Sequence, residues 1–165
     1  MVKRSMLLVV GMLLVNQRVP LAAQAAGVGD VAPVVSIADL DGKPVRVGVG
    51  VTKHPVVVEF WATWCEVCRA LLPTMRAAQK QYGDRVDFYG VNVTVNERKE
   101  RVKQYVAQNH PPFVTVYDDR GVAARAFGAM ATSYVVIIDR NGKVAYTGDG
   151  SDQKIAAELA KLVGK

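Results

Sequence analysis

The chain has 165 residues, of which half are hydrophobic, 21 are lysine or arginine, 15 are aspartate or glutamate, and only two are cysteine. This length suits one domain with a core of its own. Two cysteines exclude a scaffold held by several disulfides, and they exclude a zinc or iron–sulfur site built from four cysteines. The net charge of +6 would point to nucleic acid or an anionic membrane only if it belonged to the folded domain.

The N-terminal segment, residues 1–25, has the order of features found in a secretory signal peptide. Two basic residues precede a ten-residue apolar run, 6–15, and small residues follow, with Ala23 and Ala25 before the expected cleavage site. The run is short for a membrane span, which needs about 20 residues. An uncleaved N-terminal anchor and a helix buried in the fold stay open as alternatives. No cysteine follows the run closely, which excludes a lipoprotein anchor.

Removal of this segment changes the meaning of the charge. Residues 26–165 carry 18 basic and 15 acidic side chains, a net charge of +3, and the basic residues do not gather in one stripe. The sequence therefore argues against nucleic acid as a partner, and it allows membrane contact only through an N-terminal anchor. We expect a periplasmic or otherwise exported protein, in a compartment where disulfide chemistry is permitted.

The rest of the chain predicts alternating strands and helices in an α/β fold. Residues 55–61 form a near-continuous apolar run, which is typical of a central strand covered on both faces. Thr94 and Glu97 have the spacing of a capping box at the start of a helix, and Asn141-Gly142 favours a two-residue hairpin loop. We expect a central mixed sheet flanked by helices, with further strands at 86–93, 113–117, 134–139 and 144–147, and helices at 68–82, 97–108 and 153–163.

Both cysteines lie in one motif, Cys65-Glu66-Val67-Cys68, directly after the predicted central strand and at the start of a helix. Free N–H groups and the dipole at a helix N-terminus stabilise a thiolate, so Cys65 is expected to be the nucleophile. Cys68 lies one turn later and can attack the mixed disulfide that Cys65 forms, as the resolving thiol. A C-x-x-C near a βαβ pattern is a redox signature. The pattern predicts a redox-active disulfide that works without a cofactor.

A metal site is the other use that two nearby cysteines allow. Most such sites need two more ligands, and the only histidines, His54 and His110, are far from the pair in the sequence. Two thiolates alone can bind Cu(I) as soft ligands. A Cu(I)-binding module or metallochaperone therefore stays open as the alternative to an enzyme.

The block from Phe60 to Arg69, F-W-A-T-W-C-E-V-C-R, resembles the active-site block of the thioredoxin superfamily, and most closely that of its exported TlpA/ResA-like thiol–disulfide oxidoreductases. Further matches to this branch are its N-terminal hairpin motifs (Val28 to Pro33 and Leu40 to Val45), the kink proline Pro73, and the I-D-R-x-G-K-V hairpin (Asp139 to Val144). The resemblance covers nearly all of residues 26–165. It implies a thioredoxin-like fold with a central helix–strand insertion at about 102–113.

The same resemblance implies an activity and partners. Relatives of this branch reduce protein disulfides, often those of apocytochrome c during cytochrome c maturation. A membrane thiol reductant of the DsbD/CcdA type keeps them reduced. The expected substrate-binding residues lie around the cysteine pair and in the loop that faces it: Trp64, Glu66, Thr132 and Ser133.

Ser133 departs from the superfamily, which usually has a cis proline at this position in the loop facing the reactive sulfur. A cis bond before a residue other than proline costs about 2.5–4 kcal/mol, so the bond between Thr132 and Ser133 is expected to be trans. Ser133 would then offer its hydroxyl and N–H to a protein partner. The alternative is that Ser133 only fills the turn.

Two further positions concern proton transfer. Glu59 stands in the predicted central strand, where thioredoxin has an aspartate and the disulfide isomerases a glutamate. A buried acid is costly unless satisfied and has a raised pKa, so Glu59 is expected to accept the proton of Cys68 when the mixed disulfide is resolved. The alternative places Glu59 on an exposed face of the strand. Leu71 stands where related reductants often carry a glutamate, and it cannot take up protons.

The residues between the cysteines favour a reductant. The carboxylate of Glu66 opposes thiolate formation and Val67 adds no positive charge, whereas pairs that stabilise the thiolate strongly are oxidants. Copper-delivery relatives usually have a histidine near the position of Ser133, and no histidine follows His110. Peroxidases of the superfamily resemble P-x-x-x-T-x-x-C, and Val58 and Ala62 replace that proline and threonine. A thiol peroxidase is thus a weaker alternative.

Overall fold

The computed structural model describes residues 26–48 and 54–163, so the proposed signal segment 1–25 lies outside the described residues. Within these ranges, no helix has the length and hydrophobicity needed to cross a membrane. The elements in chain order are β1 (Val35–Ala38), β2 (Pro44–Val47), β3 (Val56–Trp61), α1 (Glu66–Tyr82), β4 (Asp87–Val93), α2 (Lys99–Asn109), β5 (Val114–Asp118), α3 (Val122–Phe127), β6 (Tyr134–Ile138), β7 (Val144–Gly148) and α4 (Ile155–Val163).

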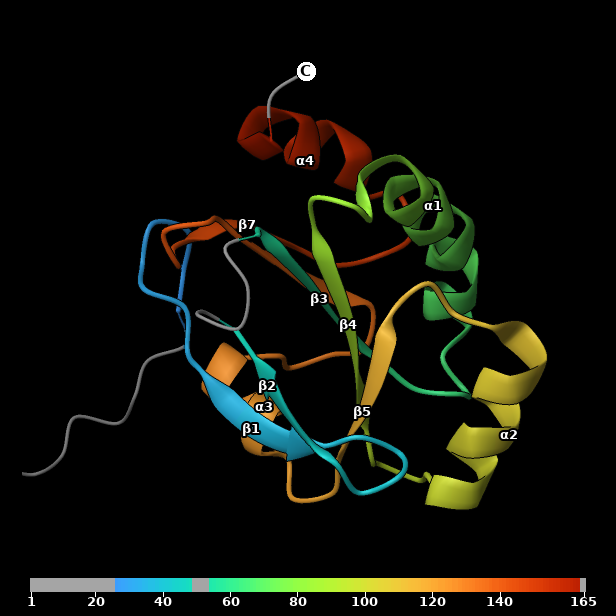
Figure 1. Cartoon of the computed structure of the whole chain (residues 1–165). Coiled ribbons are helices and arrows are strands. Elements are labelled where there is room, and N and C mark those ends of the chain that lie inside the picture. Colours follow the sequence, from blue (N-terminus) through green and yellow to red (C-terminus); the bar gives the residue numbers. More distant parts are fainter. Residues whose placement is uncertain (1–25, 49–53, 164–165) are drawn as a thin grey trace, which may run out of the picture.

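A five-stranded mixed sheet forms the centre of the molecule, in the order β5-β4-β3-β6-β7 (Figure 1). β3 is the middle strand and pairs parallel with β4 and antiparallel with β6. β5 extends the parallel half, and β7 extends the antiparallel half through a hairpin with β6. Every residue of β3 is buried, which confirms the central strand that its apolar run predicts.

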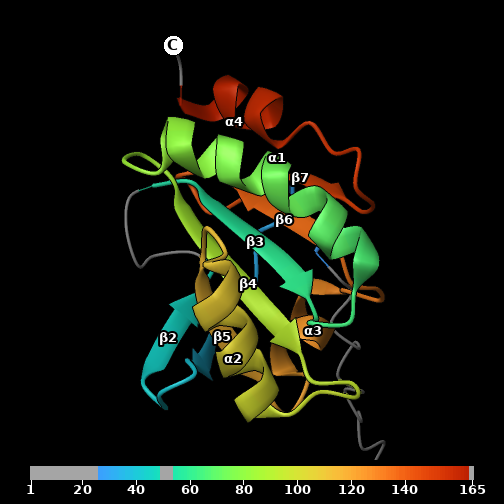
Figure 2. The ribbon, with the colours of Figure 1, turned by 90° about the vertical axis from the view of Figure 1, so that its right-hand side faces the viewer.

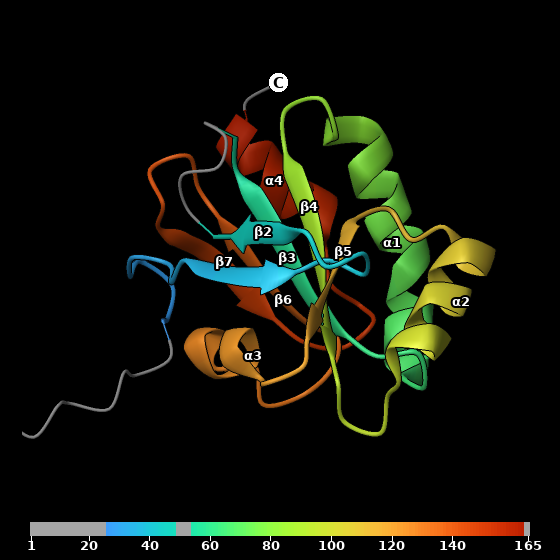
Figure 3. The ribbon, with the colours of Figure 1, turned by 60° about the horizontal axis from the view of Figure 1, so that its bottom comes forward.

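Helices cover both faces of this sheet. α1 and α4 lie side by side on one face (Figure 2), where Leu71 and Met75 of α1 pack with Leu159 of α4 against Val57 of β3. α2 covers the same side near the end of β3, and its Val102 joins Trp61 and the cysteine pair in a smaller cluster. The opposite face is covered by α3 and the β1–β2 hairpin (Figure 3). The architecture is the predicted one, with the N-terminal hairpin as a separate small sheet.

Local hydrogen bonds explain two differences from the expected elements. α3 was not predicted, because six residues are too few to show a hydrophobic period. The buried carboxylate of Asp118 caps this helix, accepting from the N–H groups of Val122 at 2.7 Å and Ala124 at 2.9 Å. The loop between β6 and β7 is longer than the two residues that its Asn-Gly favours. It is closed by Asp139, whose carboxylate accepts from the N–H groups of Asn141 and Lys143.

Candidate active site

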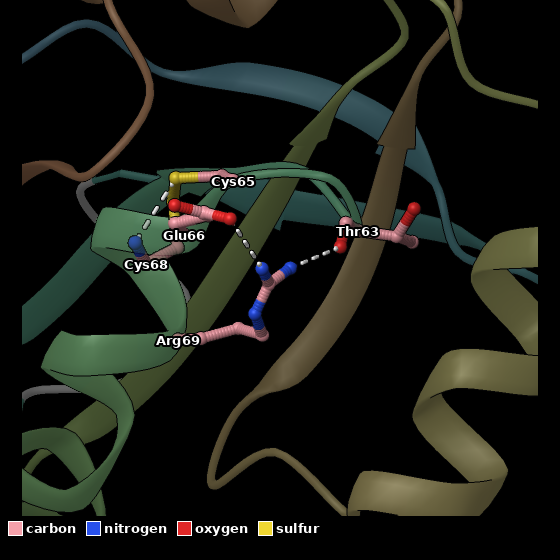
Figure 4. A network of polar contacts seen from close by, with 5 residues as sticks. All are labelled: Thr63, Cys65, Glu66, Cys68 and Arg69. Carbon is pink, nitrogen blue, oxygen red and sulfur yellow. Dashed lines mark hydrogen bonds and ion pairs between the residues drawn. A yellow bond between two sulfur atoms is a disulfide. The ribbon is translucent and has the colours of Figure 1, made fainter.

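The cysteine pair lies where β3 ends and α1 begins. Cys65 and Cys68 form a disulfide with an S–S distance of 2.05 Å, so the structure describes the oxidised protein. Cys65 is the N-cap of α1, and its Sγ accepts a hydrogen bond from the N–H of Cys68 over 3.0 Å (Figure 4). A free N–H and the helix dipole both favour negative charge at this sulfur. Both cysteines are almost covered, with exposed fractions of 4% and 6%.

A cation lies at the same helix start. In Figure 4 the guanidinium of Arg69 reaches between Glu66 and Thr63: it pairs with the Glu66 carboxylate at 3.5 Å and donates to the Thr63 carbonyl at 3.2 Å. The Glu66 side chain is 88% exposed, and an exposed pair of this kind contributes little to stability. The pair does offset the charge of Glu66 locally. Glu66 therefore opposes thiolate formation less than the two residues between the cysteines predict by themselves.

One wall of an apolar pocket is Trp64, the residue before Cys65. The pocket has a volume of about 280 Å³ and is lined by Trp64, Val93, Val95, Ala124, Ala129, Met130, Ala131 and Thr132. Trp64 is 40% exposed and Met130 is 95% exposed. Two of the candidate substrate-binding residues, Trp64 and Thr132, thus belong to one hydrophobic surface.

Ser133 does not belong to that surface. It is fully buried, with a positive φ of 66°, and the bond before it is trans, as expected. Its N–H donates to the carbonyl of Phe60 at 2.7 Å and its hydroxyl donates to the carbonyl of Gly150 at 2.9 Å. Its own carbonyl accepts from Gln153. The expectation that Ser133 offers its hydroxyl and N–H to a partner is therefore wrong for this structure, since both groups are used inside the fold. Ser133 fills and fixes the turn.

Glu59 lies in the middle of β3 and is 2% exposed, so the alternative of an exposed strand face is wrong. Its side chain is on the α1 side of the sheet, because Val57 and Trp61, the alternate residues of β3, pack in the clusters beneath α1 and α2. The Oε2 atom is buried without a hydrogen-bond partner among the described residues. Burial raises the pKa of Glu59 from 4.5 to about 8.

The structure adds one residue that sequence reasoning assigned elsewhere. Glu97 does not form a capping box with Thr94: α2 begins at Lys99 without a side-chain cap, and the Thr94 hydroxyl donates to Asp118. The carboxylate of Glu97 instead accepts from the N–H and the hydroxyl of Thr63, at 2.9 and 2.6 Å. No local pattern could reveal this contact, because the two residues are 34 positions apart in the chain.

In the part of the chain that the structure describes, no three or more His, Cys, Asp or Glu side chains come together as a metal-binding cluster.

The Redoxin family model matches residues 27–163, a range that includes the cysteine pair and all the residues of the site. The chain belongs to the Redoxin family. This redoxin is 31% identical to Thioredoxin-like protein YneN of Bacillus subtilis over 70% of its own length and 68% of that protein. It is also 31% identical to Thiol-disulfide oxidoreductase ResA of Geobacillus thermodenitrificans, over 84% of its own length and 79% of that protein.

Solved structures give the same result for the fold. A thiol:disulfide interchange protein DsbE from Chlorobium tepidum is similar to this redoxin with a TM-score of 0.70 and 26% identity, covering 84% of the redoxin and 96% of that chain. The thioredoxin domain of a Bacteroides vulgatus thiol-disulfide oxidoreductase has a TM-score of 0.72 at 22% identity. With the C-x-x-C disulfide at 65–68, these findings identify a thiol–disulfide oxidoreductase of the thioredoxin superfamily, similar to TlpA and ResA.

Proposed function

We propose that this redoxin is an exported reductant of protein disulfides, with Cys65 as the nucleophile and Cys68 as the resolving thiol. The observation that carries the proposal is the position of Cys65 as N-cap of α1, where its Sγ accepts the N–H of Cys68. Once the pair is reduced, that N–H favours the thiolate on Cys65 over the thiolate on Cys68. The features of residues 1–25 support export.

The reaction moves two electrons from the cysteine pair to the substrate. The Cys65 thiolate attacks one sulfur of a substrate disulfide, which forms a mixed disulfide and releases the first substrate thiolate. The Cys68 thiolate then attacks Sγ of Cys65, which restores the disulfide seen in the structure and releases the second substrate thiolate. A membrane thiol reductant of the DsbD/CcdA type would reduce the pair again.

Glu59 would take the proton of Cys68 before the second step. Its pKa of about 8 is close to the value of about 8.5 of an ordinary cysteine thiol, so the transfer costs little free energy. About a tenth of the Glu59 side chains are ionised at pH 7 with such a pKa. Its place on the α1 side of β3 supports this role, because α1 also carries Cys68.

The substrate is proposed to be an extended polypeptide segment around a disulfide. The apolar pocket at Trp64, Met130 and Thr132 is lined by the residue that precedes Cys65, and it suits an apolar side chain that flanks the attacked cysteine. Apocytochrome c, with its haem-binding C-x-x-C-H cysteines, is the candidate substrate that the resemblance to ResA suggests.

The reduction potential of the cysteine pair tests the direction of the reaction. The protein is equilibrated with glutathione buffers of defined ratio, and its reduced fraction is measured by thiol alkylation. We expect a potential well below that of the strongest periplasmic oxidant, about −120 mV, and reduction of an oxidised C-x-x-C-H peptide by the dithiol form. A potential near −120 mV, or no reduction of that peptide, would contradict a reductant.

A further inference from the structure

One carboxylate outside the cysteine motif binds the loop that carries the motif. Glu97 lies between β4 and α2, and its two oxygens accept from both donors of Thr63: Oε2 from the N–H at 2.9 Å and Oε1 from the hydroxyl at 2.6 Å. The side-chain amide of Asn92 donates to Oε2 at 3.1 Å and holds the carboxylate in place. Thr63 is only 6% exposed, so water does not compete freely for these donors.

The remaining polar group of Thr63 is bound as well. Its carbonyl accepts from the guanidinium of Arg69 at 3.2 Å, so every hydrogen-bonding group of this residue has a partner. Thr63 lies inside the turn that ends at Cys65, where the N–H of Cys65 donates to the carbonyl of Ala62 at 3.2 Å. A shift of Thr63 must therefore move Cys65.

The loop that carries Glu97, residues 94–97, also binds Trp64. The indole N–H of Trp64 donates to the carbonyl of Val95 at 2.8 Å, two residues before Glu97. Thr94 anchors this loop in turn through its hydroxyl, which donates to the carbonyl of Asp118 at 3.1 Å. Thus residues 94–97 connect the turn 62–65 to the end of β5.

We infer that Glu97 is a positioning residue for thiol–disulfide exchange, which holds Thr63 and thereby places Cys65 and Trp64 against a protein substrate. Hydrogen bonds to a carboxylate are shorter and stronger than those to a neutral acceptor, and exchange needs the attacking sulfur in line with the substrate disulfide. A displacement of about 1 Å can slow a reaction about a hundredfold. The inference rests on the proposed function in one respect, namely that the substrate of Cys65 is a protein disulfide.

Two substitutions of Glu97 distinguish the effect of its hydrogen bonds on the position of Thr63 from the effect of its negative charge. Glu97→Gln can keep all three contacts, since its oxygen accepts from Thr63 N–H and Asn92, and its NH₂ donates to the Thr63 hydroxyl. Glu97→Ala loses them all. Glu100→Ala is the matched control, because Glu100 is an exposed acid in the first turn of α2. Each variant is assayed for kcat/KM with an oxidised C-x-x-C-H peptide and for its thermal unfolding.

We expect kcat/KM to fall at least tenfold in Glu97→Ala, and to stay within about threefold of the wild type in Glu97→Gln and Glu100→Ala. A wild-type rate in Glu97→Ala would overturn the inference. Equal losses in Glu97→Ala and Glu97→Gln would overturn it too, because the negative charge and not the position of the loop would then matter. The tryptophan emission maximum, to which Trp61 and Trp64 both contribute, should shift in Glu97→Ala and stay unchanged in Glu97→Gln and Glu100→Ala.

A second variant covers the case in which Glu97→Ala does not fold. Thr63→Val removes only the hydroxyl and keeps the N–H bond to Glu97, and we expect it to fold and to lose severalfold in rate. A wild-type rate in Thr63→Val, with Glu97→Ala unfolded, would assign Glu97 to stability and overturn the inference. The rate at which reduced Cys65 attacks a small aromatic disulfide is measured in parallel. That reaction does not depend on the substrate in the cell, so it tests Glu97 even if the chain reduces no protein disulfide.

Discussion

The N–H of Cys68 donates a hydrogen bond to Sγ of Cys65 across 3.0 Å, and this contact makes the two sulfurs chemically unequal. Only Cys65 has the helix N-cap position that stabilises a thiolate. We predict that Cys68→Ser accumulates a mixed disulfide with an oxidised C-x-x-C-H peptide on Cys65, visible by mass spectrometry without reductant. Cys65→Ser should accumulate at least tenfold less. Equal trapping by the two variants would show that the nucleophile is assigned wrongly.

Glu59 should make the stability of the oxidised protein depend on pH. Below pH 4.5 the carboxyl is protonated in both the folded and the unfolded chain, and it contributes no pH dependence. Between 4.5 and about 8 the unfolded chain ionises while burial keeps the folded side chain protonated, so the free energy of unfolding falls as pH rises. The total loss is at most on the order of 5 kcal/mol.

Glu59→Gln removes this titration. We predict that the free energy of unfolding in urea differs progressively more between the variant and the wild type from pH 5 to pH 9. The variant should be the more stable of the two at pH 9. Glu66→Gln, at a side chain that is 88% exposed, serves as the control and should follow the wild type at every pH. Parallel curves for wild type and Glu59→Gln would contradict the buried, protonated carboxyl.

Glu59→Gln should also slow the second step of exchange. Loss of a general base typically costs about a hundredfold or more, and we expect at least a tenfold loss because water can replace part of the function. In a single-turnover experiment at pH 7, the mixed disulfide should form at the wild-type rate and decay slowly. If both steps keep their wild-type rates, Glu59 has no part in proton transfer.

Met130 should contribute to substrate binding and not to the chemistry. It is 95% exposed and lines the same pocket as Trp64, and Met130→Ser removes apolar surface that a substrate would cover. We predict a severalfold higher KM for a protein disulfide and an unchanged rate with a small aromatic disulfide. Val28→Ser, at a 64% exposed valine in the segment before β1, is the control for loss of exposed apolar surface. A KM that rises equally in both variants would argue against the pocket.

Ser133→Pro, which restores the usual residue of the superfamily, should destabilise this protein. Proline fixes φ near −65° and has no N–H, whereas Ser133 has a φ of 66° and donates to Phe60. We predict a loss of about 3 kcal/mol or more in the free energy of unfolding. Ser133→Gly tolerates the positive φ and should lose only about 1 kcal/mol, for the hydroxyl bond to Gly150. Equal stability of the two variants would mean that the turn adapts to proline.

The elements that the sequence predicted well are those whose signal is local. An apolar run predicts β3, and all six residues of this strand are buried. Apolar residues at helical spacing, among them Leu71 and Met75, predict α1. The sequence does not predict α3, because the helix is short and Asp118, which caps it, has no pattern that distinguishes it from an acid in a loop. Of the two motifs expected in the N-terminal hairpin, Leu40 to Val45 covers its turn and the start of β2, whereas Val28 to Pro33 lies before β1.

The sequence by itself predicted a redox-active disulfide, because both cysteines occupy one four-residue motif at the start of a helix, and it left Cu(I) binding as the alternative. It also located an acid in the central strand. Only the tertiary structure decided that Oε2 of Glu59 is buried without a hydrogen-bond partner among the described residues, that Ser133 makes its hydrogen bonds inside the fold, and that Glu97 holds the turn before Cys65. These features depend on residues that are far apart in the chain, such as Thr63 and Glu97, and they exist only after the strands have paired and brought their ends to one edge of the sheet.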